Sequence, residues 1–113
     1  MTNTEYLIEL SMLSTVLFAH HQYKDEQYFN DLELQEEWFQ IPFHRLVVKN
    51  INYNKQLKLP TYEEFICESL IQDGIMDGDL WLKIIGANPF SKVLFEKYLV
   101  NLEKHSDKMI EGI

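Results

Sequence analysis

The side chains best suited to chemistry in this sequence are four histidines, one cysteine and an aspartate-rich turn. The histidines are His20, His21, His44 and His105, and the cysteine is Cys67. Metal fingers need such residues at short, regular spacings, which are absent here. The segment from Asp73 to Asp79 resembles a calcium loop, but its ligand spacing is wrong and the closing bidentate glutamate is missing. We therefore expect no metal site.

Catalysis requires a converging set of groups, and the sequence contains none of the recognised sets. It has no G-x-x-x-x-G-K-[ST] phosphate loop, no G-x-G-x-x-G, no H-E-x-x-H and no G-x-S-x-G. Cys67 has no neighbouring base or cation to activate it, which favours inert packing. We predict a protein without catalytic or cofactor-binding residues that is not an enzyme. A small enzyme with an unrecognised motif is the alternative.

The composition predicts one globular domain, residues 1–113. Ten Lys and Arg stand against 18 Asp and Glu, a formal net charge of −8. Phosphate binding needs clustered cations, so this balance argues against direct nucleic acid binding and against an anionic membrane surface. A single cysteine fits a reducing cytoplasm. No apolar run approaches the roughly 20 residues that span a bilayer, and the acidic N-terminus lacks the basic region of a signal peptide. We expect a cytoplasmic location.

The segment from Trp38 to Ile51 is the one around which we expect the rest to be organised. Pro42 suits the first position of a helix, where its missing N–H costs nothing. An apolar stripe at helical spacing follows, with His44 and Arg45 inside it. For these two residues the expected role is structural, with their stems packed and their polar ends in solvent or capping a neighbour.

Start and stop signals place the other helices. Thr2 and Glu5 have capping-box spacing before a helix so apolar, Tyr6 to Phe18, that we expect it at the centre, ending near His20 and His21. Asp25 to Leu34 is a short helix or a loop.

Thr61 and Glu64 predict a second capping box, with Phe65, Ile66, Ser69 and Leu70 buried behind it. A turn ending in an aspartate N-cap precedes a short helix from Leu80 to Ile85, which a left-handed Gly86 would stop. Ser91 caps the last helix, whose stripe is Leu94, Phe95, Tyr98, Leu99 and Leu102.

These elements predict an all-α fold, a compact bundle of about six helices. The predicted core follows from the periodicity of each segment and comprises Leu10, Leu13, Leu17, Phe39, Phe43, Leu46, Val47, Phe65, Leu80, Ile84, Phe95 and Leu99.

Three stretches, in order along the chain, are similar to the pattern of one known family. The first is E-L-S-M-L-S-T-V-L, Glu9 to Leu17, against Glu-x-x-hydrophobic-Leu-Gly-x-hydrophobic-Leu in the family, so Leu13 matches and Ser14 replaces the glycine. The second has Phe39, Pro42, His44 and Arg45 before a hydrophobic run, and a later proline matches Pro60. The third is D-L-W-L-K-I-I-G-A-N-P-F, then F-E-K-Y-L-V-N-L, which contains Tyr98. Together they resemble the N-terminal domain of DnaB-type bacterial replicative helicases.

The resemblance implies a non-catalytic module that organises the helicase ring and contacts primase and other replication proteins. It implies a protein partner in the replisome (helicase, primase or loader), and self-association as a further property. Two departures affect it: Tyr62 stands where the family has an aspartate, and no arginine lies near Met109. The family continues into a helical hairpin, a linker and an ATPase domain, so the chain is either a helicase fragment or a free-standing relative.

Two alternative identities of the domain are also consistent with the sequence. The C-terminal helicase-binding domain of primase has a related helical fold, and a phage- or plasmid-encoded adaptor or inhibitor of the helicase is a further possibility. For the docking surface we predict residues of the last helix that lie off its core stripe, namely Phe90, Val93, Lys97 and Val100. The alternative for Phe90 is that it tucks under the loop after Gly86.

Overall fold

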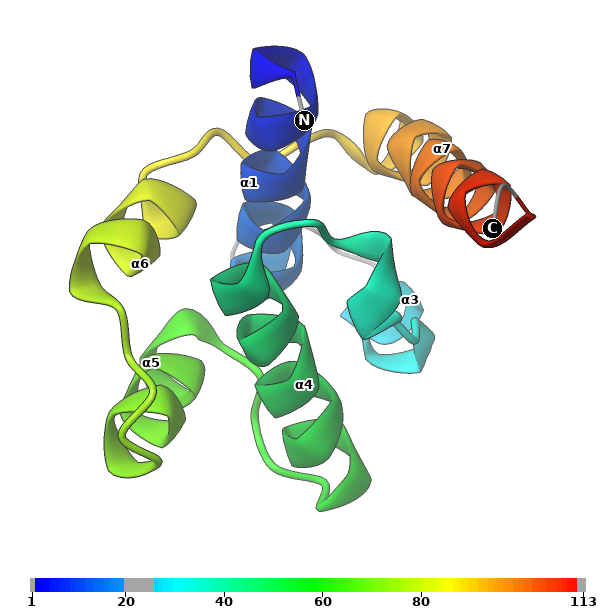
Figure 1. Ribbon diagram of the computed structural model, residues 1–113. Coiled ribbons are helices and arrows are strands. Elements are labelled where there is room, and N and C mark those ends of the chain that lie inside the picture. Colours follow the sequence, from blue (N-terminus) through cyan, green and yellow to red (C-terminus); the bar gives the residue numbers. More distant parts are fainter. Residues whose placement is uncertain (1, 20–25, 112–113) are drawn as a thin grey trace.

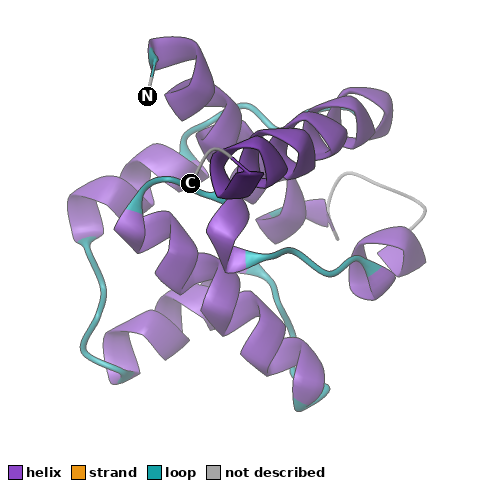
Figure 2. Ribbon diagram, turned by 45° about the vertical axis from the view of Figure 1, so that its right-hand side comes forward, coloured by secondary structure: helices purple, strands orange, loops and turns teal. Residues whose placement is uncertain are grey.

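The computed structural model describes residues 2–19 and 26–111, with side chains for residues 2–19 and 27–103. Within these ranges the chain forms six α-helices and one short 3₁₀ helix. They are α1 (Asn3–Leu17), α3 (Glu26–Asp31), η1 (Glu36–Trp38), α4 (Pro42–Gln56), α5 (Glu63–Gln72), α6 (Gly78–Ile85) and α7 (Lys92–Glu111) (Figure 1). Loops connect them and the described residues contain no strand (Figure 2). The all-α prediction is confirmed. His20 and His21 lie outside the described residues.

Helix α1 lies at the centre, as its sequence predicts. It contacts α4, α6 and α7, and Figure 1 shows it between α6 and α7. From Glu9 to Leu17 every residue except Ser11 is buried, because helices pack on several faces of this segment. The expected capping box is present: the side chain of Thr2 accepts from the N–H of Glu5, whose carboxylate accepts from the N–H of Thr2.

Helix α4 begins at Pro42, as predicted, and ends in a left-handed turn. The N–H of Lys58 donates to the carbonyl of Lys55, and the N–H of Leu59 donates to the carbonyl of Asn54. These two bonds define a Schellman motif, whose turn residue is usually glycine. Here the turn residue is Lys58, with φ of 57°. The side chain of Asn54 donates to the carbonyl of the exposed Pro60, which holds the following loop against the helix.

The predicted start of α5 is wrong. The helix begins at Glu63, its N-cap is Tyr62, and no side chain caps it. Thr61 is therefore one residue too early for its hydroxyl to serve as the N-cap acceptor. Phe65, expected in the core, is 44% exposed. The buried stripe of α5 is Ile66 and Leu70, four residues apart, and Phe65 lies at its edge, with its ring in edge contact with Tyr62.

Ser91 marks the start of α7 as predicted, whereas α6 has the expected aspartate N-cap but begins at Gly78, two residues before the expected Leu80. Asp77 is the N-cap of α6, and its side chain accepts from the N–H of Leu80. Ser91 caps α7 by accepting from the N–H of Leu94. Gly86 ends α6, but with φ of −85° it is not left-handed, so that expectation is wrong. The left-handed glycine is Gly74, after α5, with φ of 72°.

The core contains most of the residues predicted for it. Eight of these are buried: Leu10, Leu13, Leu17, Phe39, Phe43, Val47, Ile84 and Phe95. Leu46, Leu80 and Leu99 are half-buried and pack against its margin. Trp81 and Phe29, which the core prediction omitted, are also buried. The ring of Phe29 meets that of Phe95 at 5.3 Å, which ties the short helix α3 to α7.

The turn after α5 is a Schellman motif as well, because the N–H of Gly74 donates to the carbonyl of Ile71 and the N–H of Ile75 donates to that of Leu70. The two Schellman turns predict opposite effects on stability. A left-handed conformation is unfavourable for a residue with a Cβ and free for glycine. We expect Lys58→Gly to raise the free energy of unfolding by about 1 kcal/mol and Gly74→Ala to lower it by about 1 kcal/mol. Urea denaturation of the two variants and the parent measures both changes. If Lys58→Gly instead lowered the free energy of unfolding, the lysine side chain would contribute more stability than its left-handed conformation costs.

Candidate functional site

A buried carboxylate connects the first two stretches of the family resemblance. Glu9 on α1 is 2% exposed, and His44 on α4 is fully buried. The Nδ1 atom of His44 lies 3.0 Å from Oε1 of Glu9. The main-chain N–H of Gln40 donates to both carboxylate oxygens, each at 3.2 Å. Glu9 thereby joins α1 to the turn that leads into α4.

Of the two outcomes expected for His44, solvent or a neighbour, the structure shows the second: the ring is buried and bonded to Glu9. Its ring packs beside that of Tyr6, with centroids 6.2 Å apart and planes at 21°. Because the Glu9 carboxylate is an acceptor, the bond between them requires Nδ1 to carry the hydrogen. The other ring nitrogen, Nε2, is buried without a hydrogen-bond partner. His44 lies on the face of α4 that packs against α1, so its ring contacts Tyr6 and Glu9 of α1 instead of water.

Arg45 acts as the sequence predicts, by capping a neighbour. The residue is exposed, and its Nε donates to the carbonyl of Phe39 at 2.6 Å. The ring of Phe39 is fully buried. Phe39, Pro42 and Arg45 therefore shape one tight entry into α4, with the ring in the core, the proline at the first helical position and the guanidinium closing the turn.

The third stretch of the resemblance is also bonded to α1. The hydroxyl of Ser14 donates to the carbonyl of Ala87 at 2.9 Å. One residue on, the hydroxyl oxygen of Thr15 accepts from the N–H of Phe90 at 2.8 Å. Ser14 replaces the glycine of the family pattern, and in this chain its hydroxyl holds the loop between α6 and α7. Helix α1 is thus the common partner of the other two stretches.

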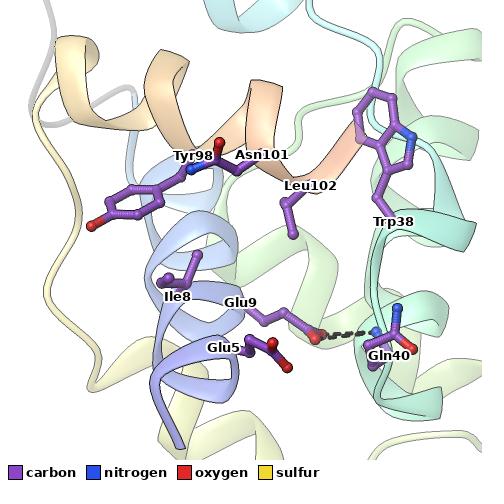
Figure 3. Close-up of a pocket in the computed structure, with 8 residues that line it drawn as sticks. All are labelled: Glu5, Ile8, Glu9, Trp38, Gln40, Tyr98, Asn101 and Leu102. Carbon is purple, nitrogen blue, oxygen red and sulfur yellow. Dashed lines mark hydrogen bonds between the residues drawn. The ribbon is translucent and has the colours of Figure 1, made fainter. Parts of the chain in front are cut away.

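A pocket opens beside Glu9, between α1, η1 and α7. Its volume is about 180 Å³. Figure 3 shows Ile8, Glu5 and Glu9 on the α1 side, Trp38 and Gln40 opposite, and the α7 residues Tyr98, Asn101 and Leu102 above. The walls are mainly apolar, and the two glutamates are the charged residues of the lining. Glu9 and Tyr98 were singled out by the resemblance, whereas Trp38, Gln40 and Asn101 were not linked to any site.

Three of the four residues predicted for the docking surface on α7 are exposed, and the fourth is half-buried. Val93 and Val100 are 76% and 46% exposed, and Lys97 is exposed as well. Phe90 is half-buried, and its ring stacks on that of Tyr98 at 4.9 Å. Leu94, expected on the core stripe, is 42% exposed. Between residues 92 and 103 of α7, where the side chains are described, the accessible apolar face therefore consists of Val93, Leu94 and Val100 beside Lys97.

A half-buried lysine, Lys55, secures the short helix α3 against α4. The Nζ atom of Lys55 donates to the carbonyl of Phe29 at 2.9 Å and to that of Leu32. Burial lowers the pKa of Lys55, while the nearby carboxylates of Glu33 and Asp31 raise it. A cation at these carbonyls suits the negative end of the helix dipole, so this contact is structural.

Nothing in the described part of the chain assembles a metal site, since no three His, Cys, Asp or Glu residues are grouped there. None of the helices in that part is long and apolar enough to cross a membrane. The pocket residues were missed because they come from three separate elements. The one available signal was Glu9 itself, a charge in the most apolar segment of the sequence.

No family model, no curated protein and no solved structure matches the chain. The resemblance to the helicase N-terminal domain therefore rests on the three sequence stretches.

Proposed function

We propose that the chain is a non-catalytic protein-interaction domain of bacterial DNA replication, similar in role to the N-terminal domain of the DnaB-type replicative helicase. Its partner is a component of the replisome: the helicase, the primase or the helicase loader. This role places the protein in the cytoplasm. It requires neither a cofactor nor direct contact with nucleic acid.

The observation that carries the proposal is the set of bonds among the three stretches on which the resemblance rests. Glu9 bonds to Gln40 and His44 of the second stretch, while Ser14 and Thr15 bond to Ala87 and Phe90 of the third. Residues far apart in sequence that match one family pattern thus form one connected framework. In such a framework the motif residues hold the helices together, and the residues that contact a partner lie on the surface.

The surface of the domain is consistent with docking. The net charge of −8 disfavours phosphate backbones. On α7, Val93, Leu94 and Val100 are exposed beside Lys97. Exposed aliphatic groups with a charged side chain at their margin fit an interface whose centre is apolar and whose rim is polar.

Direct binding to purified replication proteins tests the proposal. The chain is mixed in turn with a DnaB-type helicase hexamer, the primase and the loader of one bacterium, and each mixture is examined by size-exclusion chromatography with light scattering. We expect a complex with at least one of them. Binding to the intact helicase favours the alternative of a helicase-binding domain or adaptor, and light scattering of the chain alone reports self-association. No complex with any of the three would overturn the proposal.

The exposed face of α7 predicts a specific loss of binding. We expect the double variant Val93→Ser, Val100→Ser to weaken the complex at least tenfold, because about 1.4 kcal/mol of apolar contact corresponds to that factor. Phe90 is left in place because its ring supports Tyr98. Titration by calorimetry measures the change.

A matched control uses two exposed apolar residues elsewhere. Ile71 on α5 and Leu82 on α6 are 59% and 63% exposed. The variant Ile71→Ser, Leu82→Ser should bind like the parent, and both double variants should keep its melting temperature within a few degrees. If the α7 variant is folded and binds normally, the docking surface does not include α7.

A further inference from the structure

The pocket beside Glu9 combines apolar walls with two carboxylates. Ile8, Trp38 and Leu102 line its apolar part, and Glu5 and Glu9 lie together at the α1 side (Figure 3). No lysine, arginine or histidine is among the lining residues. A cleft with low-dielectric walls and charge of one sign concentrates its field and attracts the opposite charge.

The carboxylate of Glu9 is held firmly, and no cationic residue belongs to the pocket lining. Its partners are the main-chain N–H of Gln40 and Nδ1 of His44. A carboxylate accepts about four hydrogen bonds, so acceptor capacity is left on Glu9. Glu5 is exposed, and one of its oxygens accepts from the N–H of Thr2. Both groups therefore retain lone pairs for an incoming donor.

The size and chemistry of the pocket point to one side chain. A volume of about 180 Å³ lies below the roughly 300–1,000 Å³ of sites for drug-sized ligands, and it suits one long side chain. An apolar group would strip water from the carboxylates without returning hydrogen bonds. An anion would be repelled. An arginine side chain matches both kinds of lining residue. Its guanidinium donates in a fixed fork to carboxylates, and its flat face and stem pack on aromatic and aliphatic groups.

We propose that this pocket receives an arginine side chain presented by the partner protein. The stem packs against Ile8, Trp38 and Leu102, and the guanidinium donates to the carboxylates of Glu5 and Glu9. The inference deepens the proposed docking role, on which it rests, by naming the chemistry of the partner: a segment with an exposed arginine. The docking site then extends from the exposed face of α7 over its edge to α1 and η1.

The test uses the full chain and two small probes, arginine amide and citrulline amide, which share a similar shape and differ in charge at the head group. Titrations are followed by ¹H–¹⁵N NMR at constant ionic strength. With arginine amide we expect saturable shifts of the Trp38 indole N–H and the Gln40 amide. The indole N–H of Trp81, which is buried and does not line the pocket, is the internal reference. Citrulline amide should bind at least tenfold more weakly.

Matched charge variants locate the site. Glu5→Gln keeps the side-chain oxygen that accepts from Thr2 and removes one charge at the pocket, so we expect at least threefold weaker binding of arginine amide. Glu64→Gln removes one charge from an exposed position on α5 and should change nothing. Absent shifts at Trp38, equal binding of both probes, or unchanged binding by Glu5→Gln would each overturn the inference.

These outcomes are separable from those of the proposed function. If arginine amide fails to bind while a replication protein still forms a complex, the pocket inference alone is lost. If arginine amide binds and no replication protein does, the pocket inference stands as a site for an arginine and the replication role is lost.

Discussion

Replacing Glu9 with alanine is expected to lower the free energy of unfolding by about 2–6 kcal/mol, because two donors lose their acceptor and each unsatisfied buried donor costs about 1–3 kcal/mol. The substitution leaves the N–H of Gln40 and Nδ1 of His44 without their acceptor inside the protein. Small domains are stable by only about 5–15 kcal/mol, so the loss should be a large fraction of the total stability. Urea denaturation followed by circular dichroism measures the loss.

Two further variants separate the possible causes. Glu68→Ala truncates an exposed glutamate within α5 and should change the free energy of unfolding by no more than about 0.5 kcal/mol. Glu9→Gln retains an oxygen that can accept from Gln40 and should be less damaging than Glu9→Ala. If Glu9→Ala were as stable as Glu68→Ala, the bonds of Glu9 would contribute nothing net to the fold.

Truncating Phe43 to alanine is the second large expected effect, at about 3–5 kcal/mol of lost stability. Phe43 is 5% exposed, in the first turn of α4, and belongs to the main core cluster. Removal of its ring leaves a cavity that rigid neighbouring helices cannot close, which adds to the lost hydrophobic transfer energy. Thermal and urea denaturation of the purified variant give the magnitude.

Phe65 provides the matched control for that experiment. It is the same residue type in the first turn of another helix, but it is 44% exposed. Phe65→Ala should therefore cost much less than Phe43→Ala, because much of its ring already contacts water. Equal losses for the two variants would mean that Phe65 is buried in solution, as its sequence periodicity alone predicts.

The Glu9 network links stability and docking in one place. Glu9 both joins α1 to the start of α4 and lines the pocket proposed for an arginine. A Glu9 variant would therefore lose binding simply through loss of structure. Glu5, exposed and one turn earlier on the same helix, is the position at which the charge of the pocket can be changed while the framework is kept.

Signals that act within one turn of helix were enough to place most helix ends. Thr2 with Glu5, Pro42 and Ser91 act on N–H groups or backbone angles of residues next to them, and each begins a helix as predicted. The aspartate cap of α6 is also local, but it is Asp77, and the helix begins at Gly78 rather than at Leu80. The failure at Thr61 is instructive. Thr61 and Glu64 have the spacing of a capping box, but the helix starts at Glu63, so spacing without the backbone conformation of the cap is not sufficient.

Periodicity identified which segments have an apolar face, but not the rotation of each helix against its neighbours. On α5 the stripe Phe65, Ile66, Ser69, Leu70 is wide enough to be centred at more than one angle. The structure centres it on Ile66 and Leu70 and leaves Phe65 at the edge. That choice depends on the shape of α4 and the core beneath it, which no local window contains.

The sequence by itself therefore determined the all-helical class, the central position of α1 and the absence of recognised catalytic motifs, because these follow from composition, periodicity and contacts within a few residues. Only the tertiary structure decided that Glu9 bonds to His44 and Gln40, 35 and 31 positions away. It alone brought Glu5, Trp38 and Leu102 to one pocket. The physical reason is that such contacts depend on how three rigid helical elements pack together, and each residue's own neighbours in sequence carry no record of that arrangement.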